Sequence, residues 1–266
     1  MFPISRPEEP ALSPVAFELA VQDSHGLEVS ARLGADRIEL CSALALGGVT
    51  PSLAFVEAAV ATPGIPPVHV LVRPRPGGFT YDPAETATIL RDVRHVLLAG
   101  ATGVVIGGVR DATVDTDLVK RVLDAAGDAT VTFHRAFDTL TDPATAVETL
   151  AALGVRRILT SAGATSVGDA LPALAALTTT AAGRIEIMAG GGVTLGLIPA
   201  LLRTGVPAIH ASAKRVVPDD LTVGLGTSSP AGAGGRETTD EVTAAAILAA
   251  IREAEEHRRP CERSIN

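Results

Sequence analysis

Three side chains capable of chemistry stand together where an apolar run ends, in the stretch Val131-Thr-Phe-His-Arg-Ala-Phe-Asp138. His134 can exchange a proton near neutral pH, and Arg135 can bind a carboxylate or a phosphate. Asp138 could join them in a site, or it could only cap a following helix. Because buried strands normally exclude charged groups, this concentration predicts a site, provided that other strands end in the same way.

Two earlier strand-like runs each carry a glutamate among apolar residues, Glu18 in the first and Glu39 in the second. Side chains alternate along a strand, so Arg37, Glu39 and Cys41 share a face. We expect Glu39, Cys41 and Glu18 to point inwards. Two inward carboxylates need partners of opposite charge. The partners that we expect are Arg73, Arg75 and His134.

These groups allow two interpretations. In the first, they line a polar pocket for a small ligand, where glutamate and histidine transfer protons or bind a divalent metal. In the second, they form a buried ion-pair network that only closes the core. The candidate pocket residues are Glu18, Glu39, Arg73, His134 and Asp138.

A glycine-rich turn, Gly190-Gly191-Gly192, follows the seventh strand-like run, and Ser212 and Lys214 follow the eighth. Exposed backbone N–H groups suit an anion, and lysine adds positive charge to an otherwise acidic chain. The loops after strands seven and eight are also the usual phosphate site of an α/β barrel. We therefore expect a small anion to bind at this turn.

The elements that must position these residues repeat eight times. Strand-like runs alternate with alanine- and leucine-rich segments of helical period, such as Pro83–Ala99, Asp115–Ala126 and Pro143–Leu153. This pattern predicts one (β/α)8 barrel over residues 15–258. An open doubly wound sheet is the alternative. The runs begin near Ala16, Ala35, Pro67, Thr102, Ala129, Arg156, Arg184 and Pro207.

Three segments do not follow this alternation of strands and helices. Met1–Pro14 is rich in proline and glutamate and is expected to be a disordered lead, with residues 259–266 as a tail. Val217–Asp240 is a Gly/Ser-rich loop without periodicity, which could be a lid or an unstructured insertion. A last helix is expected over about Glu241–Arg258.

Composition limits the class of protein. Of 266 residues, 47% are hydrophobic and 20% charged, with a net charge of −8 and a pI near 5.3. This acidity argues against nucleic-acid binding. We expect no membrane span and no signal peptide. Cys41 and Cys261 lie far apart, so a disulfide framework is not expected and a cytosolic location is.

Seven stretches together resemble the CutC family, proteins described in connection with copper homeostasis. The resemblance extends from about Phe17 to Lys214. It implies a TIM-like barrel, a cytoplasmic homo-oligomer and Cu(I) as the bound ion. The stretches are Gly34-Ala-Asp-Arg-Ile-Glu-Leu-Cys41, Gly47-Gly-Val-Thr-Pro-Ser52, Arg73-Pro-Arg-Pro-Gly-Gly-Phe79, Val131-Thr-Phe-His-Arg-Ala-Phe-Asp138, Leu159-Thr-Ser-Ala-Gly163, Met188-Ala-Gly-Gly-Gly192 and His210-Ala-Ser-Ala213.

The resemblance implies a copper site around Cys41, since Cu(I) prefers thiolate and thioether ligands. Several relatives carry further cysteines where Ala20 and Ala211 stand here. The copper ligands that remain are Cys41, Met188 and His210, with His134 as another imidazole. The alternative function is a barrel enzyme (a lyase, isomerase or hydrolase) acting on a small anionic, possibly phosphorylated, substrate. A metal-free scaffold with an ionic core is the third reading.

Overall fold

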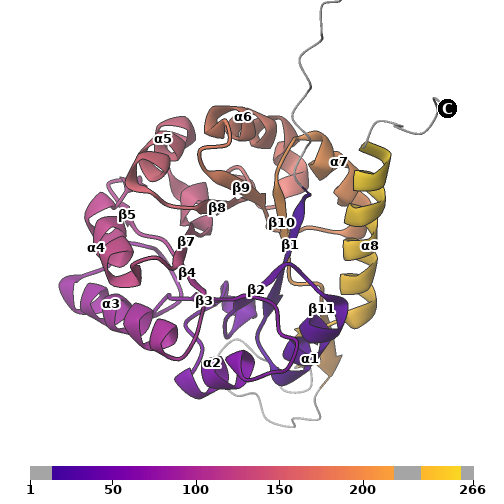
Figure 1. Cartoon of the computed structure of the whole chain (residues 1–266). Coiled ribbons are helices and arrows are strands. Elements are labelled where there is room, and N and C mark those ends of the chain that lie inside the picture. Colours follow the sequence, from indigo (N-terminus) through magenta and orange to yellow (C-terminus); the bar gives the residue numbers. More distant parts are fainter. Residues whose placement is uncertain (1–13, 219–234, 259–266) are drawn as a thin grey trace, which may run out of the picture.

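Eight parallel strands close into a barrel that is surrounded by helices (Figure 1). This computed structural model describes residues 14–218 and 235–258. Around the barrel the strands follow the order β1-β10-β9-β8-β7-β4-β3-β2. The (β/α)8 barrel is thereby confirmed, and the open doubly wound sheet is wrong because β1 pairs with both β2 and β10.

Each barrel strand begins within two residues of its expected start, because a run of apolar residues marks each one. The barrel strands are β1 (Ala16–Val21), β2 (Arg37–Leu40), β3 (Val68–Leu71), β4 (Gly103–Ile106), β7 (Thr130–Phe133), β8 (Arg157–Thr160), β9 (Glu186–Ala189) and β10 (Ala208–Ala211). The helices are α1 (Ser24–Leu33), α2 (Leu53–Val60), α3 (Pro83–Leu98), α4 (Thr116–Ala126), α5 (Pro143–Leu153), α6 (Leu171–Ala181), α7 (Ile198–Arg203) and α8 (Glu241–Arg258).

Local sequence explains several helix ends. The Asp82 carboxylate accepts a hydrogen bond from the Glu85 N–H and the Glu85 carboxylate accepts one from the Asp82 N–H, with Pro83 in the first turn of α3. Gly34 ends α1 in the left-handed region at φ 67°, a conformation that costs glycine nothing. These signals fix the turns that return the chain to the barrel.

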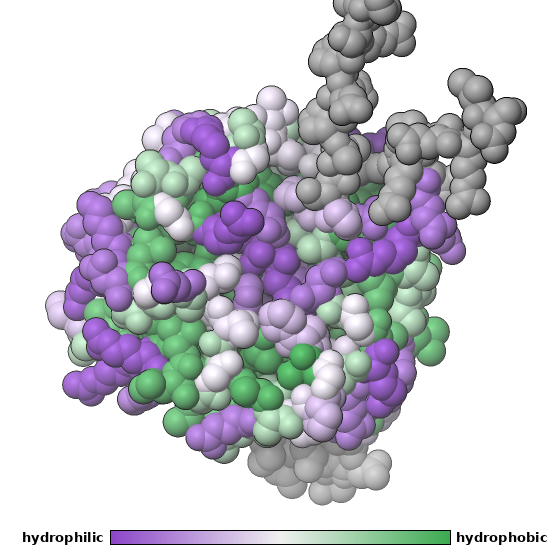
Figure 2. Space-filling view, in the orientation of Figure 1, coloured by the Kyte–Doolittle hydropathy of each residue, from purple (hydrophilic) through white to green (hydrophobic). Residues whose placement is uncertain are grey.

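The barrel has an apolar outer layer and a largely polar axis. Phe17 and Leu19 of β1 are buried in the main core between strands and helices, whereas Glu18 between them is buried against polar partners. Inside the barrel, two small apolar clusters form separately, one at Cys41 and the other at Met188. Figure 2 shows hydrophilic side chains at the centre of the visible face.

Two strands lie at the ends of the segment 217–240, where only a loop was expected. Strand β11 (Lys214–Pro218) pairs antiparallel with β12 (Gly235–Thr239). The Gln22 side-chain amide donates to the Glu237 carbonyl at 3.0 Å, which ties this hairpin to the loop after β1. Residues 219–234, the expected tail and the expected lead up to residue 13 lie outside the described residues. A second hairpin joins β5 (Val109–Arg110) and β6 (Thr113–Val114).

Within residues 14–218 and 235–258, no helix combines the length and the apolar character that a bilayer crossing requires.

Candidate active site at the barrel mouth

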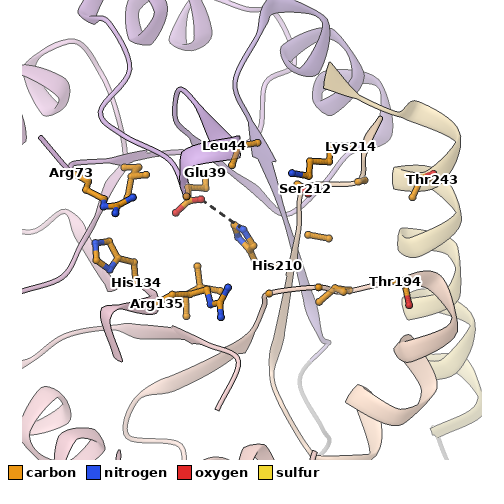
Figure 3. Close-up of a pocket in the computed structure, with 18 of the residues that line it drawn as sticks. Glu39, Leu44, Arg73, His134, Arg135, Thr194, His210, Ser212, Lys214 and Thr243 are labelled. Carbon is orange, nitrogen blue, oxygen red and sulfur yellow. Dashed lines mark ion pairs between the residues drawn. The ribbon is translucent and has the colours of Figure 1, made fainter. Parts of the chain in front are cut away.

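A cavity of about 550 Å³ opens among the loops that follow the strands (Figure 3). Polar and charged groups line it on several sides, and leucines and Phe79 supply the apolar wall. Of the residues expected at the site, Glu39, Arg73, His134, Gly191, Gly192, His210, Ser212 and Lys214 line the cavity. The remaining expected residues Glu18, Cys41, Asp138, Met188 and Gly190 do not.

His210 on the cavity wall lies between two glutamates, Glu39, which also lines the cavity, and Glu18, which lies behind it. The Nδ1 atom of His210 lies 2.8 Å from Oε1 of Glu18, and its Nε2 lies 3.8 Å from Oε2 of Glu39. Cross-strand register explains the first contact, since Glu18 stands opposite His210 on the neighbouring strand. The second distance exceeds a hydrogen bond, so both Nε2 and the Glu39 carboxyl remain able to contact a ligand.

Burial and charge give these three groups different proton affinities. Burial would raise the pKa of Glu18, but the hydrogen bond from His210 and the charge of Arg37 outweigh it and hold this pKa well below its usual range. Burial, together with the charge of Glu18, raises the pKa of Glu39 to about 7, although His210 opposes the shift. Burial would lower the pKa of His210, but hydrogen bonding to Glu18 and the charges of both glutamates raise it. Glu39 therefore titrates near neutral pH, His210 keeps its proton to a higher pH than an ordinary histidine, and Glu18 stays ionised.

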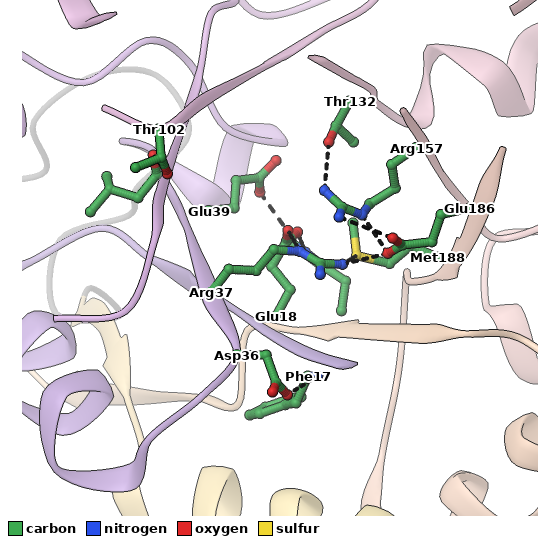
Figure 4. A network of polar contacts seen from close by, with 12 residues as sticks. Phe17, Glu18, Asp36, Arg37, Glu39, Thr102, Thr132, Arg157, Glu186 and Met188 are labelled. Carbon is green, nitrogen blue, oxygen red and sulfur yellow. Dashed lines mark hydrogen bonds and ion pairs between the residues drawn. The ribbon is translucent and has the colours of Figure 1, made fainter. Parts of the chain in front are cut away.

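The partners of Glu18 differ from those expected. Arg37 donates from Nε to Glu18 at 2.7 Å and from Nη2 to Glu186 at 2.8 Å (Figure 4). Arg157 in turn binds both oxygens of Glu186 and the Thr132 hydroxyl. The expectation that Arg73, Arg75 or His134 would pair with the glutamates is wrong: Arg75 pairs with Glu85 outside the barrel.

Arg73 lies at the mouth without a carboxylate partner in the described structure. Its Nη1 donates to the carbonyls of Leu46 and Gly48 and its Nη2 to that of Gly77. Only 5% of Arg73 is exposed, and its Nε has no acceptor at hydrogen-bond distance among the described residues, although the buried Tyr81 hydroxyl lies close enough for Arg73 to act on the pKa of Tyr81. The guanidinium therefore holds two loops at the rim and leaves its charge uncompensated.

His134 is also buried at the mouth, with its ring turned so that one nitrogen is free. Its Nδ1 accepts a hydrogen bond from the Ala136 N–H at 3.1 Å, while Nε2 has no partner among the described residues. A side chain at position 107 would begin 2.4 Å from the imidazole, so Gly107 makes room for the ring. Burial, followed by the charge of Arg73, lowers the pKa of His134 to about 3, so this histidine is neutral at physiological pH.

Asp138 supports the site from behind. It accepts from Arg135 Nε at 2.8 Å, from the Thr160 and Ser161 hydroxyls, and from backbone N–H groups of the loop after β8. The fixed Arg135 guanidinium faces the cavity, and its Nη1 donates to no described residue. Asp138 and Arg135 both belong to the 3-10 helix η2 (Arg135–Thr139). Asp138 thus positions the Arg135 side chain and does not itself contact a ligand.

The glycine turn after β9 divides into a structural and an exposed part. The Gly190 N–H donates to the Thr160 carbonyl at 2.9 Å, so it cannot serve an anion as expected. Gly191 and Gly192 line the cavity, and their N–H groups meet no acceptor within the described part of the chain. Gly191 lies against Arg135: a Cβ there would begin 2.8 Å from the guanidinium carbon.

The residues expected to hold copper do not converge. The Cys41 thiol is buried with Leu71 and Val105, and burial raises its pKa well above the usual range. The Met188 sulfur accepts from Arg37 at 3.2 Å, in the other apolar cluster. Within the part of the chain that the structure describes, no three His, Cys, Asp or Glu side chains gather as metal ligands. This donor set does not fit a Cu(I) site; Cys261 lies outside the described residues.

Sequence reasoning placed Arg37 on the same face as Glu39 but did not name it as the partner of Glu18. It missed Arg157 and a further histidine, His69, which is buried and lacks a partner for Nδ1 among the described residues. The alternation that turns Glu39 inwards also turns Arg37 inwards. The charged residues Arg157 and Glu186 that begin β8 and β9 carry the same period-two signal.

A family model, curated relatives and a solved structure all relate this chain to the same protein family. A model of the CutC family matches residues 15–215. The family protein CutC of Sinorhizobium medicae is 39% identical over 243 residues, covering 89% of this chain and 96% of that protein. The family protein CutC of Agrobacterium fabrum is 42% identical over 233 residues, covering 86% and 90%.

A crystal structure of a CutC protein from Streptococcus agalactiae has the same fold. It matches with a TM-score of 0.69 at 30% identity, covering 74% of this chain and 98% of that one. The name of that protein assigns it a proposed role in copper homeostasis.

The raised pKa of Glu39 predicts how its removal changes stability with pH. Between pH 4.5, the ordinary value, and about 7, the unfolded chain releases this proton while the folded chain keeps it. The free energy of unfolding of the wild type should therefore fall relative to Glu39→Gln as pH rises through this window, by up to about 3 kcal/mol. Urea unfolding of both proteins from pH 4 to 8 measures it.

Glu57→Gln, which removes an exposed carboxylate on α2, is the matched control and should track the wild type. A wild-type free energy of unfolding that stays constant or rises relative to that of Glu39→Gln between pH 4.5 and 7 would contradict the assignment.

Proposed function

The chain belongs to the CutC family, and from the site that it carries we propose that it is a barrel enzyme moving protons on a small anionic substrate. The observation that supports this most is His210, fixed by the buried Glu18 and facing Glu39 across a cavity lined by Arg73 and Arg135. A carboxyl that titrates near neutral pH and a neighbouring imidazole whose pKa is raised are suited to general acid–base catalysis. The reaction class is a lyase, isomerase or hydrolase.

The three central residues take distinct roles in this proposal. Glu39 removes a proton from the substrate or returns one to it, and His210 acts as its counterpart through Nε2. Glu18 remains ionised and stabilises the imidazolium whenever His210 is protonated, while its contact at Nδ1 fixes the ring. The 3.8 Å between Nε2 and the Glu39 oxygen lets a substrate atom contact both.

The substrate's negative charge would lie at the turn after β9. Arg135 offers a free Nη1, and Gly191 and Gly192 offer backbone N–H groups. Ser212 and Lys214 line the opposite side of the Glu39–His210 pair from Arg73 and His134 (Figure 3). The charge of Lys214 is partly satisfied by Glu237 at 2.6 Å, so Arg135 is the stronger candidate for the anion.

Amine chemistry is a poor match to this barrel. The chain has two lysines, Lys120 on α4 and Lys214 on β11, and neither belongs to a barrel strand. A Schiff base needs a desolvated lysine beside the substrate, and Lys214 is 40% exposed and ion-paired. Proton transfer by carboxyl and imidazole groups is therefore the chemistry that we propose.

Copper(I) handling is the second candidate function, favoured by the name of the Streptococcus agalactiae relative. In this proposal Cys41 is the first ligand, assisted by His210 or Met188. The side chains would have to rearrange, because Cys41 and Met188 lie in separate clusters and His210 is engaged by Glu18. We also propose a cytoplasmic location and a homo-oligomer, which rest on the family resemblance alone.

The proton-transfer proposal predicts isotope exchange or cleavage. In deuterium oxide, the full chain should introduce deuterium into, or cleave, at least one member of a panel of small carboxylic and phosphorylated acids. Mass spectrometry of the acids measures both reactions. Glu39→Gln should slow this by at least about 100-fold, the usual contribution of a general acid or base. Glu57→Gln should react as the wild type does. A panel without reaction, or an unchanged rate in Glu39→Gln, would reject the proposed role.

The copper proposal predicts weak binding. Under anaerobic conditions, the chain should lose Cu(I) to a bathocuproine chelator, because Cu(I) requires two soft ligands within bonding reach. Cys41→Ser should remove the remaining binding, whereas Cys261→Ser and Glu39→Gln should leave it unchanged. A tight stoichiometric complex in Cys41→Ser would overturn this ligand assignment.

A further inference from the structure

Two buried hydrogen-bond donors at the mouth have no acceptor within the described residues: Nε of Arg73 and Nε2 of His134. Each residue is only 5% exposed. Leaving a buried donor unpaired destabilises the folded protein, and a buried charge without a partner destabilises it more. Two such donors on residues that line one cavity indicate that a bound ligand supplies their hydrogen-bond acceptors.

The state of His134 follows from its backbone contact. Because Nδ1 accepts a hydrogen bond from the Ala136 N–H, the proton of the neutral ring is on Nε2. The free atom is therefore a donor, like Nε of Arg73. An acceptor of hydrogen bonds, and not a second donor, is what both positions require.

One aromatic ring contacts both side chains, and the charge of Arg73 acts on His134. The Phe79 ring lies 5.0 Å from the His134 ring and 5.0 Å from the Arg73 guanidinium carbon. Figure 3 shows Arg73 and His134 on the same side of the Glu39–His210 pair. The Phe79 carbonyl accepts from the Val109 N–H at 2.9 Å, so the backbone is held and only the ring needs to turn.

We propose that Arg73 and His134 form a subsite for a carboxylate group of the substrate, which enters when the Phe79 ring turns aside. Two donors match the two oxygens of a carboxylate, and the single charge of Arg73 matches its single negative charge. A phosphate would carry more oxygens and more charge than these two donors satisfy. The subsite rests on the proposed function and deepens it: the substrate is a carboxylic acid with a second anionic group toward Arg135.

The subsite places the carboxylate on the other side of the Glu39–His210 pair from Ser212 and Lys214. The reacting atom then lies between the carboxylate and the second anion, within reach of the proton-transferring groups. A carboxylate held by a cation also acidifies an adjacent C–H bond, which fits the chemistry proposed for Glu39.

Acetate, which carries a carboxylate and nothing else, tests the subsite directly. The full chain, labelled with ¹⁵N-histidine, is titrated with sodium acetate at constant ionic strength, and the Nε2–H resonance of His134 is followed by NMR. We expect a saturable downfield shift of this proton. In Arg73→Met the apparent Kd should rise at least 10-fold, whereas Arg94→Met, which removes an exposed arginine of α3, should leave it unchanged.

Phe79→Ala keeps both donors and removes the ring that contacts them, so acetate should bind it more tightly than the wild type. This variant keeps the test decisive if Arg73→Met does not fold. A His134 resonance that acetate leaves unmoved in both wild type and Phe79→Ala would overturn the subsite. Inorganic phosphate separates the two proposals: binding that depends on Arg135, without any acetate effect at His134, rejects the subsite and leaves the proposed function standing.

Discussion

A single ionised carboxylate inside the barrel, Glu18, sets the arrangement of the groups around it. It is fully buried, and a buried charge is tolerated only when it is paired and hydrogen-bonded. Register supplies both partners, since Glu18 stands opposite Arg37 on β2 and opposite His210 on β10. One contact points to the interior of the barrel and the other to the mouth, so the same carboxylate joins the ionic core to the candidate site.

The interior continues this pairing across the barrel. Thr132, Arg157 and Glu186 form a second lateral series in register on β7, β8 and β9, and the Arg37 contact with Glu186 links the two series. With Glu39, three carboxyl groups then lie among two arginines and the imidazoles of His69 and His210. A proton that moves between Glu39 and His210 leaves the net charge of this set unchanged, and the ionised Glu18 carboxylate 2.8 Å from Nδ1 stabilises the imidazolium that forms.

The sequence predicted what local periodicity controls. The eight strands, the helix from Glu241 to Arg258 and the inward direction of Glu39 follow from apolar spacing, helix signals and alternation. The partners of Glu18 could not be predicted in the same way, because they depend on the stagger between strands that lie far apart in the chain. The role of Gly190 was missed for a related reason: its N–H completes the sheet at Thr160, a contact visible only once β8 and β9 are aligned.

The sequence therefore predicted where the site lies, but it assigned some supporting residues to the cavity itself. Glu39, Arg73 and His134 line the cavity, whereas Glu18 and Asp138 support it from behind. The hairpin of β11 and β12 was missed because its strands are mostly exposed and lack the apolar alternation that marks a strand.

The ¹⁵N chemical shifts of the His210 ring, measured by NMR from pH 5 to 9, test the central claim most directly. If ionised Glu18 holds this ring, Nδ1 stays protonated throughout the range and only Nε2 changes with pH. In Glu18→Gln this fixed state should be lost. A wild-type ring that is neutral with its proton on Nε2 across the whole range would contradict the account.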